Sequence, residues 1–284
     1  MEVLLHQIDA FAEAPFTGNP AAVMPLTAWL PDGLLHRLAE ENNLSETAFL
    51  TPALPAAAGA PPADRPAFHL RWFTPAAEVA LCGHATLAAA AQVLEDLHPG
   101  VDGVSFWTRS GWLHVERTDD DEYVLDLPAQ RSAPVPVAPA LAAALRAEPV
   151  AAFSGPDEVL VLGSEAEIRS LRPDFGAFPA VPRGVVATAP GDSVEFVSRM
   201  FAPGIGVPED PVTGSAHAQL APIWAERLGR TEFRARQLSR RGGALRVELA
   251  GERVLVAGRC RRYLDGVVQV PDGYVTAVEG DGAG

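Results

Sequence analysis

The sequence predicts an α+β protein of two similar halves, each a set of mostly antiparallel strands wrapped around one apolar helix. The main observation is an internal repeat: Arg71–Pro75 (Arg-Trp-Phe-Thr-Pro) recurs as Arg199–Pro203 (Arg-Met-Phe-Ala-Pro), 128 residues later. Each copy leads to a glycine, Gly83 or Gly214, that opens an alanine-containing segment with helical character. Because the two copies lie nearly half a chain length apart, they indicate two related structural units.

The composition is that of an ordinary globular protein. The chain has 284 residues, is 48% hydrophobic and carries a net charge of −14, which suits two medium-sized domains. The negative charge argues against a general nucleic-acid-binding protein, because affinity for phosphates needs clustered basic residues. All 22 basic residues are arginines. This excludes a Schiff base to pyridoxal phosphate, a lysine nucleophile and a complete Walker A loop.

Cysteine content and hydropathy indicate the compartment. Cys82 and Cys260 are the only cysteines, too few for a disulfide framework, and the N-terminus has no charged segment followed by an apolar core. We therefore expect a cytoplasmic protein with free thiols. No apolar run approaches the roughly 20 residues that cross a bilayer, so no contact with a membrane is expected.

The first half alternates strand and helix signals. Strands are expected at residues 3–11, 21–24, 44–50, 68–73, 104–107, 112–117 and 123–127, and helices at 31–43 and 86–97. The last three strands are separated by turn residues, which indicates an antiparallel meander. The helix at 86–97 lacks a polar stripe, so we expect it to be buried on most sides. The Pro- and Ala-rich residues 53–66 are expected to form a surface loop.

The proline-rich residues 128–139 mark the expected junction, so the domain limits are predicted as 1–130 and 131–284. After a short Ala/Leu helix, strands are expected at residues 151–153, 158–162, 185–188, 194–201, 233–238, 244–249 and 254–258, with a helix at 216–228 that ends at Gly229. A last strand near 264–278 is expected to pair back with the first domain. A curved sheet around each apolar helix buries it in both halves.

Glu46 is the first candidate for acid–base chemistry. Period-two alternation places it on the same strand face as Leu44, Ala48 and Leu50. A carboxylate among apolar side chains lies either at a wet edge or in a poorly solvated pocket. In such a pocket desolvation raises its pKa toward that of a usable general base or acid. Charged strand residues are more often simply solvated, so both readings stay open on this evidence.

Both copies of the repeat end where a helix is expected to start. The first backbone N–H groups of a helix lack intrahelical partners and carry partial positive charge, so helix starts attract anions. If the halves face each other across a pseudo-twofold axis, both helix starts point into one cleft, which is the candidate active site. His84, Asp210 and Ser215 lie close to these starts, where they can equally serve as helix-capping or turn residues.

Four motifs, in this order along the chain, resemble the PhzF-like (phenazine biosynthesis) family. They are Phe16–Pro20, Ser45–Phe49, the Arg71–Pro75 segment with Gly83–Leu87, and Glu209–Ala216. The resemblance implies the diaminopimelate-epimerase-like fold, with two pseudo-symmetric halves that are each a β-barrel around a central helix, commonly in a homodimer. It also implies isomerisation of trans-2,3-dihydro-3-hydroxyanthranilate, or of a related small carboxylate, without a cofactor.

The resemblance also implies roles for individual residues. Glu46 is the expected proton shuttle, first base and then acid, with His84 and Asp210 assisting. Backbone groups around Gly83, Gly214 and Ser215 are expected to hold the substrate carboxylate. Asn19, in the Gly-Asn-Pro turn, is a further candidate for substrate binding, although an ordinary turn is the commoner use of this tripeptide.

Two other functions stay open. Racemases of the same fold use two cysteines, and Cys82 lies where the first of these is found, but the matching place in the second half holds Thr213, which forms no thiolate. A protein that binds a carboxylate without turnover would use the same helix starts, although an ionised Glu46 beside the ligand argues against it. No metal is expected, since the seven histidines show no pair at i, i+4 and no Cys-x-x-Cys accompanies them.

Overall fold

The computed structural model describes the chain except for residues 180–183, 272 and 275–284. The described residues form two compact units. Unit 1 contains Met1–Ala10, Pro20–Leu125 and the described residues from Arg259 onward, and unit 2 contains Phe11–Asn19 and the described residues of Asp126–Gly258. Each unit is therefore assembled from segments that are distant in sequence. None of the described helices combines the length and the apolar character that crossing a membrane would require.

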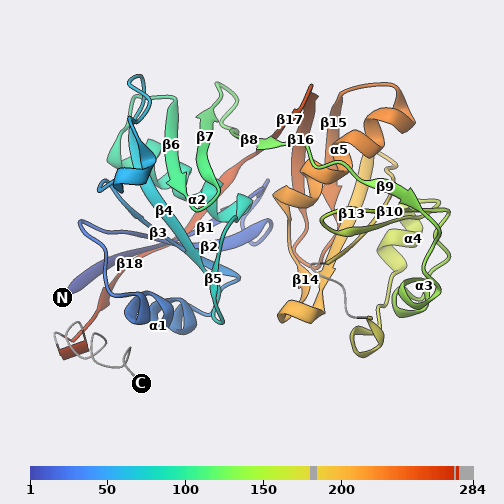
Figure 1. The fold of residues 1–284 in the computed structure, drawn as a ribbon, viewed down its shortest axis with the longest axis horizontal. Helices are drawn as coiled ribbons and strands as arrows, with labels where there is room; N and C mark the ends of the chain where they lie inside the picture. The colour runs from blue at the N-terminus through green and yellow to red at the C-terminus, as the bar shows by residue number, and fades with distance from the viewer. Residues whose placement is uncertain (180–183, 272, 275–284) are drawn as a thin grey trace. The chain divides into compact units, whose positions relative to one another are not determined.

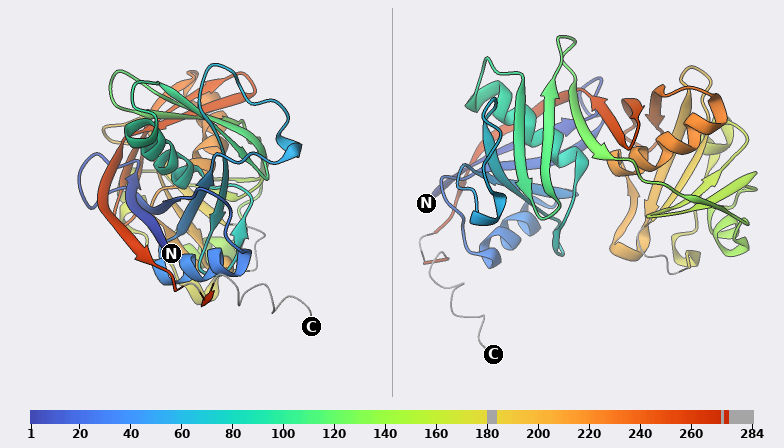
Figure 2. Two further views of the ribbon diagram at one scale, coloured as in Figure 1. Left: turned by 90° about the vertical axis from the view of Figure 1, so that its left-hand side faces the viewer. Right: turned by 45° about the horizontal axis from the view of Figure 1, so that its top comes forward.

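Unit 1 is a curved sheet around one helix (Figures 1 and 2). Its elements are β1 (Glu2–Ala10), β2 (Asn19–Pro25), α1 (Asp32–Asn42), β3 (Glu46–Thr51), β4 (Ala67–Phe73), β5 (Glu78–Val79), α2 (Gly83–Gln92), β6 (Gly103–Thr108), β7 (Gly111–Arg117), β8 (Tyr123–Pro128) and β18 (Cys260–Gln269). β18 pairs antiparallel with β1, β2 lies parallel to β3, and β4 lies parallel to β6. β6, β7 and β8 form the predicted antiparallel meander.

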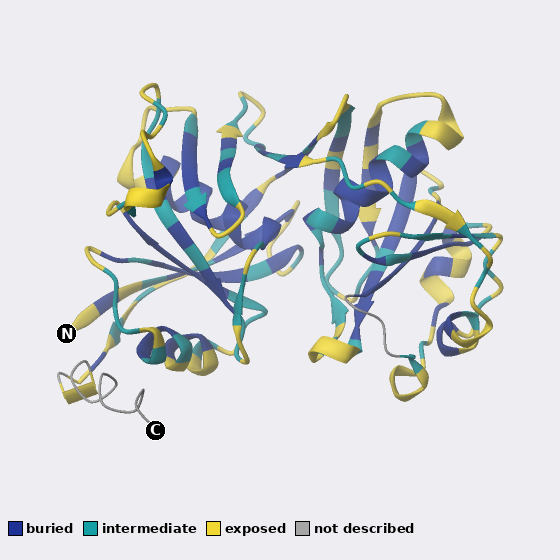
Figure 3. Ribbon diagram, in the orientation of Figure 1, coloured by how far each residue is buried: buried dark blue, intermediate teal, exposed yellow. Residues whose placement is uncertain are grey.

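Helix α2 is the core of unit 1. All ten of its residues are buried, and Figure 3 shows it in one dark colour. It contacts β1, β3 and β18, so strands cover it on several sides, as its lack of a polar stripe predicts. Five alanines among these ten residues let the strands approach the helix closely. The helix starts at Gly83, three residues before the predicted start, and its last turn continues as a short π-helix, Val93–Leu97.

Unit 2 has the same plan. Its elements are β9 (Ala133–Val135), α3 (Pro139–Leu145), β10 (Ala151–Ser154), β11 (Glu158–Val161), α4 (Glu165–Ser170), β12 (Val185–Pro190), β13 (Phe196–Ala202), β14 (Val207–Asp210), α5 (Gly214–Leu228), β15 (Glu232–Gln237), β16 (Gly243–Ala250) and β17 (Arg253–Gly258). β11 lies parallel to β12 and β13 lies parallel to β15, while β15, β16 and β17 are antiparallel. Helix α5 contacts β16 and β17 and ends at Gly229, which has the left-handed φ of +66°.

The internal repeat of the sequence is also a repeat of the structure. The order β1-β2-α1-β3-β4-β5-α2-β6-β7-β8 recurs as β10-β11-α4-β12-β13-β14-α5-β15-β16-β17. In unit 1, Arg71 forms a bidentate ion pair with Glu78, with both N···O distances 2.8 Å. In unit 2, Arg199 pairs with Glu209 at 2.7 and 2.9 Å. Both guanidinium groups also stack 5.1 Å from the ring of a phenylalanine two residues later. The repeated arginine therefore clamps the short strand that precedes each central helix.

Candidate active site

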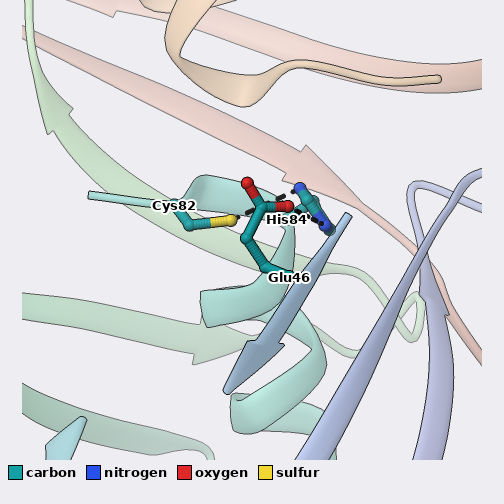
Figure 4. Close-up of side chains that lie close together, drawn as sticks. All are labelled: Glu46, Cys82 and His84. Atoms are coloured by element: carbon teal, nitrogen blue, oxygen red, sulfur yellow. Dashed lines mark hydrogen bonds and ion pairs between the residues drawn. The ribbon is translucent and has the colours of Figure 1, made fainter. Parts of the chain in front are cut away.

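Three reactive side chains meet at the N-terminal end of α2 (Figure 4). Glu46 is the first residue of β3, Cys82 is the N-cap residue of α2, and His84 is the second residue of that helix. The Nε2 atom of His84 lies 3.3 Å from Oε2 of Glu46. Its other ring nitrogen, Nδ1, lies 3.5 Å from Sγ of Cys82. The imidazole therefore stands between a carboxyl group and a thiol.

The fold explains why these groups converge. β3 lies parallel to β2 with Glu46 opposite Ala21, and it contacts α2 along the covered face of the helix. Cys82 has the extended dihedral angles of an N-cap residue, φ −145° and ψ 108°, so the chain enters the helix in the turn that carries both Cys82 and His84. The side chain of Glu46 remains 19% exposed, while that of His84 is only 5% exposed. Glu46 is therefore the member of the cluster that a substrate can reach.

Burial keeps His84 neutral. Desolvation lowers the pKa of its imidazole to about 3, because the cation loses its hydration among apolar atoms. A neutral imidazole donates from one nitrogen and accepts at the other. His84 can therefore hydrogen-bond with both Cys82 and Glu46 without carrying a charge.

This charge state gives a first prediction. The imidazole of His84 should remain neutral, in a single tautomer, from pH 5 to pH 9, because its pKa is about 3. Two-dimensional ¹H–¹⁵N NMR of the histidine rings, assigned with His84→Asn, measures this directly. Since the pKa is lower in the folded than in the unfolded protein, His84 also reduces the free energy of unfolding as the pH falls below about 6.5. A ring that titrates near pH 6.5 would show that water reaches this site.

A second cluster lies in unit 2 around Asp210, the last residue of β14. Asn19 donates from Nδ2 to Oδ1 of Asp210 at 2.8 Å and to the carbonyl of Val212 at 2.9 Å. The hydroxyl of Thr213 donates to the other carboxyl oxygen, Oδ2. Gln237 donates from Nε2 to the carbonyl of Asp210 at 2.7 Å. These bonds fix the position of the carboxyl group from both sides.

The pKa of Asp210 is raised to about 6, chiefly by desolvation. The hydrogen bonds from Thr213 and Asn19 act in the opposite direction, because they stabilise the ionised form. A carboxyl group with a pKa near 6 exchanges protons at close to neutral pH. Asp210 is thus suited to assist acid–base chemistry.

The two helix starts have the same character. Gly83 opens α2 after Cys82, Gly214 opens α5 after Thr213, and neither N-cap side chain caps its helix with a hydrogen bond. Uncapped N-terminal N–H groups, together with the helix dipole, suit a carboxylate. Ser215, the second residue of α5, is partly exposed at this end of the helix.

A pocket of about 900 Å³ opens in unit 2 close to Asp210. Phe16, Phe175, Pro211, Arg240 and Arg241 contribute to its walls. Phe16 is 70% exposed and has a left-handed φ of +68°, a conformation that disfavours a bulky residue. Glu209, whose carboxylate pairs with Arg199, also lines the pocket, and the aromatic and cationic walls suit a small molecule with an unsaturated or apolar body.

Strand register shows that the repeat is chemically asymmetric. Phe73 and Phe201 occupy the same position in the two copies of the repeat. Thr47 lies opposite Phe73, and Val185 lies opposite Phe201. The residues that precede them, Glu46 and Gly184, are therefore equivalent. Cys82 and Thr213 are equivalent as the N-cap residues of the two central helices. The carboxylate and the thiol of unit 1 therefore have no acidic or thiol counterpart in unit 2.

The predicted site residues fall into these two clusters. Glu46, Gly83 and His84 lie together in unit 1, and Asn19, Asp210, Gly214 and Ser215 lie together in unit 2. Asn19 is fully buried and contacts Asp210, so its part in substrate binding stays a prediction. Sequence reasoning did not reveal the thiol–imidazole contact or the bonds of Gln237. Only the adjacency of Cys82 and His84 hinted at the first.

Comparisons with known proteins find a matching family model and similar structures. A model of the phenazine biosynthesis-like protein family (PhzC-PhzF) matches residues 8–266. A protein from Pseudomonas aeruginosa described as an uncharacterized isomerase is 46% identical over 272 residues, covering 95% of this chain and 100% of the relative. The crystal structure of a PhzF family protein from Enterococcus faecalis is 40% identical and superposes with a TM-score of 0.87, covering 95% of this chain and all of that one.

More distant structures extend the similarity of the fold. A hydroxyproline epimerase from Agrobacterium vitis, solved with bound trans-4-hydroxy-L-proline, is 15% identical and has a TM-score of 0.58, with 96% of this chain and 94% of that chain covered. At this identity the likeness concerns the fold alone. The predicted α+β, diaminopimelate-epimerase-like architecture is confirmed.

Proposed function

The chain belongs to the phenazine biosynthesis-like (PhzC-PhzF) family, and on this premise we propose that it is a cofactor-independent isomerase of a small, carboxylate-bearing carbon acid. The observation that carries the proposal is the meeting of Glu46 and His84 at the start of α2, with Nε2 of His84 3.3 Å from Oε2 of Glu46. The relative described as an isomerase supports the reaction class.

In this proposal Glu46 transfers the proton. Its carboxylate removes a proton from one carbon of the substrate, and the electron pair delocalises over the adjacent unsaturated system. The resulting carboxylic acid exchanges its proton with water, because the side chain is 19% exposed, and then delivers a proton to a second carbon, which shifts the double bond and restores the carboxylate. One carboxyl group can perform both steps only if it is neither fully solvated nor fully neutralised, and the small exposed fraction of Glu46 next to a neutral imidazole meets that requirement.

The neighbouring groups have supporting roles. Neutral His84 donates or accepts a hydrogen bond at Glu46 as the carboxyl group changes its protonation state. Uncapped helix starts favour anions, so the backbone N–H groups at Gly83 in unit 1, and those at Gly214 and Ser215 in unit 2, are each suited to bind a carboxylate. Asp210 assists as a second acid–base group with a pKa of about 6, and Asn19 fixes its orientation.

Turnover without a cofactor tests the proposal. Purified protein would be incubated with trans-2,3-dihydro-3-hydroxyanthranilate and a panel of small unsaturated carboxylates, with no added nucleotide or pyridoxal phosphate, and the products followed by NMR. We expect a double-bond shift in at least one cyclic carboxylate. Stabilisation against heat by these compounds, with no turnover of any of them, would instead favour a binding protein.

The thiol in the cluster keeps a racemase as the second candidate function. Cys82 lies 3.5 Å from a histidine nitrogen at a helix start, a setting that can activate a thiol. A two-thiol mechanism needs a partner, and the equivalent N-cap position in unit 2 holds Thr213. The cluster at the start of α2 therefore offers one carboxylate and one thiol, which fits a single-carboxylate isomerase better.

Replacing Cys82 with alanine distinguishes the two candidates. For the proposed isomerase we expect the kcat of Cys82→Ala to stay within about tenfold of the original protein, since a missing hydrogen bond to His84 costs roughly 1 kcal/mol. Cys260→Ala is the matched control, because Cys260 is also buried and contacts the carbonyl of Leu87 rather than a reactive group. A loss of more than about 10³-fold in Cys82→Ala alone would favour the racemase.

A further inference from the structure

The cluster at the start of α2 has the composition of a metal site. One ligand atom from each of Glu46, Cys82 and His84 lies within 4.8 Å of the other two. We propose that these three side chains bind a zinc ion that blocks the carboxyl group of Glu46 and thereby inhibits the enzyme. The inhibitory part of this proposal rests on the function proposed above, whereas the binding part does not.

The spacing suits a tetrahedral zinc ion. With Zn–S near 2.3 Å and Zn–N near 2.0 Å, two ligand atoms at a tetrahedral angle lie roughly 3.5 Å apart. Sγ of Cys82 and Nδ1 of His84 are already 3.5 Å apart. Glu46 now faces the other ring nitrogen, Nε2, at 3.3 Å, so its side chain must reorient toward Nδ1 to supply the third ligand, from a position where the three ligand atoms already lie within 4.8 Å of one another. The fourth position stays open to water or to a substrate carboxylate.

The chemistry of the donors selects the ion. A thiolate, an imidazole and a carboxylate are all common zinc ligands, and the two anionic groups balance the charge of Zn²⁺. Magnesium and calcium prefer six or more oxygen ligands, which this cluster cannot supply. The sequence pattern concealed this site, since Glu46 and Cys82 are 36 residues apart and the cluster contains a single histidine.

The consequence for catalysis follows from the role of Glu46. A carboxylate that is coordinated to zinc is a much weaker base, because the cation withdraws its negative charge, and it therefore accepts a proton from a carbon acid far more slowly. Zinc is therefore expected to inhibit reversibly, and a chelator is expected to restore the activity. A substrate carboxylate that takes the open fourth position would not relieve this block, so inhibition should persist at high substrate concentration.

Cobalt provides a test that does not depend on activity. Tag-free protein would be titrated with Co²⁺, which replaces zinc and gives a near-ultraviolet thiolate-to-cobalt band together with visible bands typical of tetrahedral sites. We expect one equivalent to bind to the original protein and to the control Cys260→Ala, whose thiol has a pKa raised well above its usual value by burial. The thiolate band should vanish in Cys82→Ala and Cys82→Ser, with zinc affinity at least about 10²-fold lower.

Two further variants and one activity measurement complete the test. His84→Asn and Glu46→Gln should keep the fold, as judged by circular dichroism, and weaken cobalt binding. A spectrum that persists in both Cys82 variants, or no spectrum at millimolar Co²⁺, would overturn the site. Zinc that binds at Cys82 while isomerisation continues at its full rate would overturn the inhibition. An absence of any isomerase activity, in contrast, would refute the proposed function and leave the cobalt result intact.

Discussion

Replacing Glu46 with glutamine is expected to slow isomerisation by about 10² to 10⁴-fold, the range that removing a general acid–base group usually costs. The amide has nearly the same shape as the carboxyl group and can still hydrogen-bond His84, so folding should be unaffected. It cannot accept a proton from carbon at neutral pH. The measurement is kcat and KM for the identified substrate, and the loss should fall mainly on kcat.

A matched control separates the loss of the proton-transferring group from the loss of one negative charge. Glu40→Gln makes the same change at an exposed position on α1 in the same unit, and it should leave kcat unchanged. Thermal unfolding of both variants should lie close to that of the original protein. If Glu46→Gln retained more than a tenth of the activity, Glu46 would not be the proton-transferring group.

Replacing Asp210 with asparagine is expected to stabilise the protein at pH 7 while lowering its activity. The pKa of Asp210 is about 6 in the folded protein against an ordinary value of 3.8. Between these values the folded state binds more protons than the unfolded state, so the free energy of unfolding falls as the pH rises from 4 to 6. At pH 7 the ionised, buried Asp210 lowers the free energy of unfolding by up to about 3 kcal/mol. An asparagine removes that cost, and the hydroxyl of Thr213 can rotate to accept from the new amide.

The measurement is the difference in unfolding free energy between the two proteins as a function of pH. This difference isolates Asp210 from His84 and His217, whose pKa values of about 3 and 4 give the opposite slope. Asn19→Ala is a useful companion, because it removes one hydrogen bond to the carboxyl group and leaves the charge in place. If Asp210 served only as a turn or cap residue, Asp210→Asn would leave the activity intact. A pH slope that is the same in both proteins would show that burial does not raise the pKa of Asp210.

Much of the fold was predictable because its signals are local. The repeated arginine segments, the apolar helices and the alternating strands each appear within a short window, and the structure contains them. The last strand, expected near 264–278, instead runs from Cys260 to Gln269, and residues 275–278 lie outside the described residues. The helix starts were placed two to three residues late, since Gly83 and Gly214 have low helix propensity. Helix α4 was missed, although the hydroxyl of Ser164 caps its start by accepting from the backbone N–H of Glu167. The parallel pairs, such as β2 with β3, depend on long connections that no local pattern reveals.

The candidate site was only partly predictable because its contacts are distant in sequence. Asn19 and Asp210 are 191 residues apart and yet share a hydrogen bond. Glu46 was recognisable from its strand, but its contact with His84 depends on how β3 packs against α2. The role of Cys82 was ambiguous for the same reason, since a cysteine next to a glycine gives no sign of which side chain it faces. Tertiary packing, rather than composition, assembles the cluster.

Deuterium incorporation from heavy water tests the central claim most directly. The substrate would be converted in D₂O by the original protein, by Glu46→Gln and by Cys82→Ala, and the position and number of deuterium atoms in product and recovered substrate read by NMR and mass spectrometry. The account predicts deuterium at the carbon that receives the proton, lost in Glu46→Gln and retained in Cys82→Ala. Incorporation that requires Cys82 and inverts a stereocentre, or that survives the loss of Glu46, would contradict it.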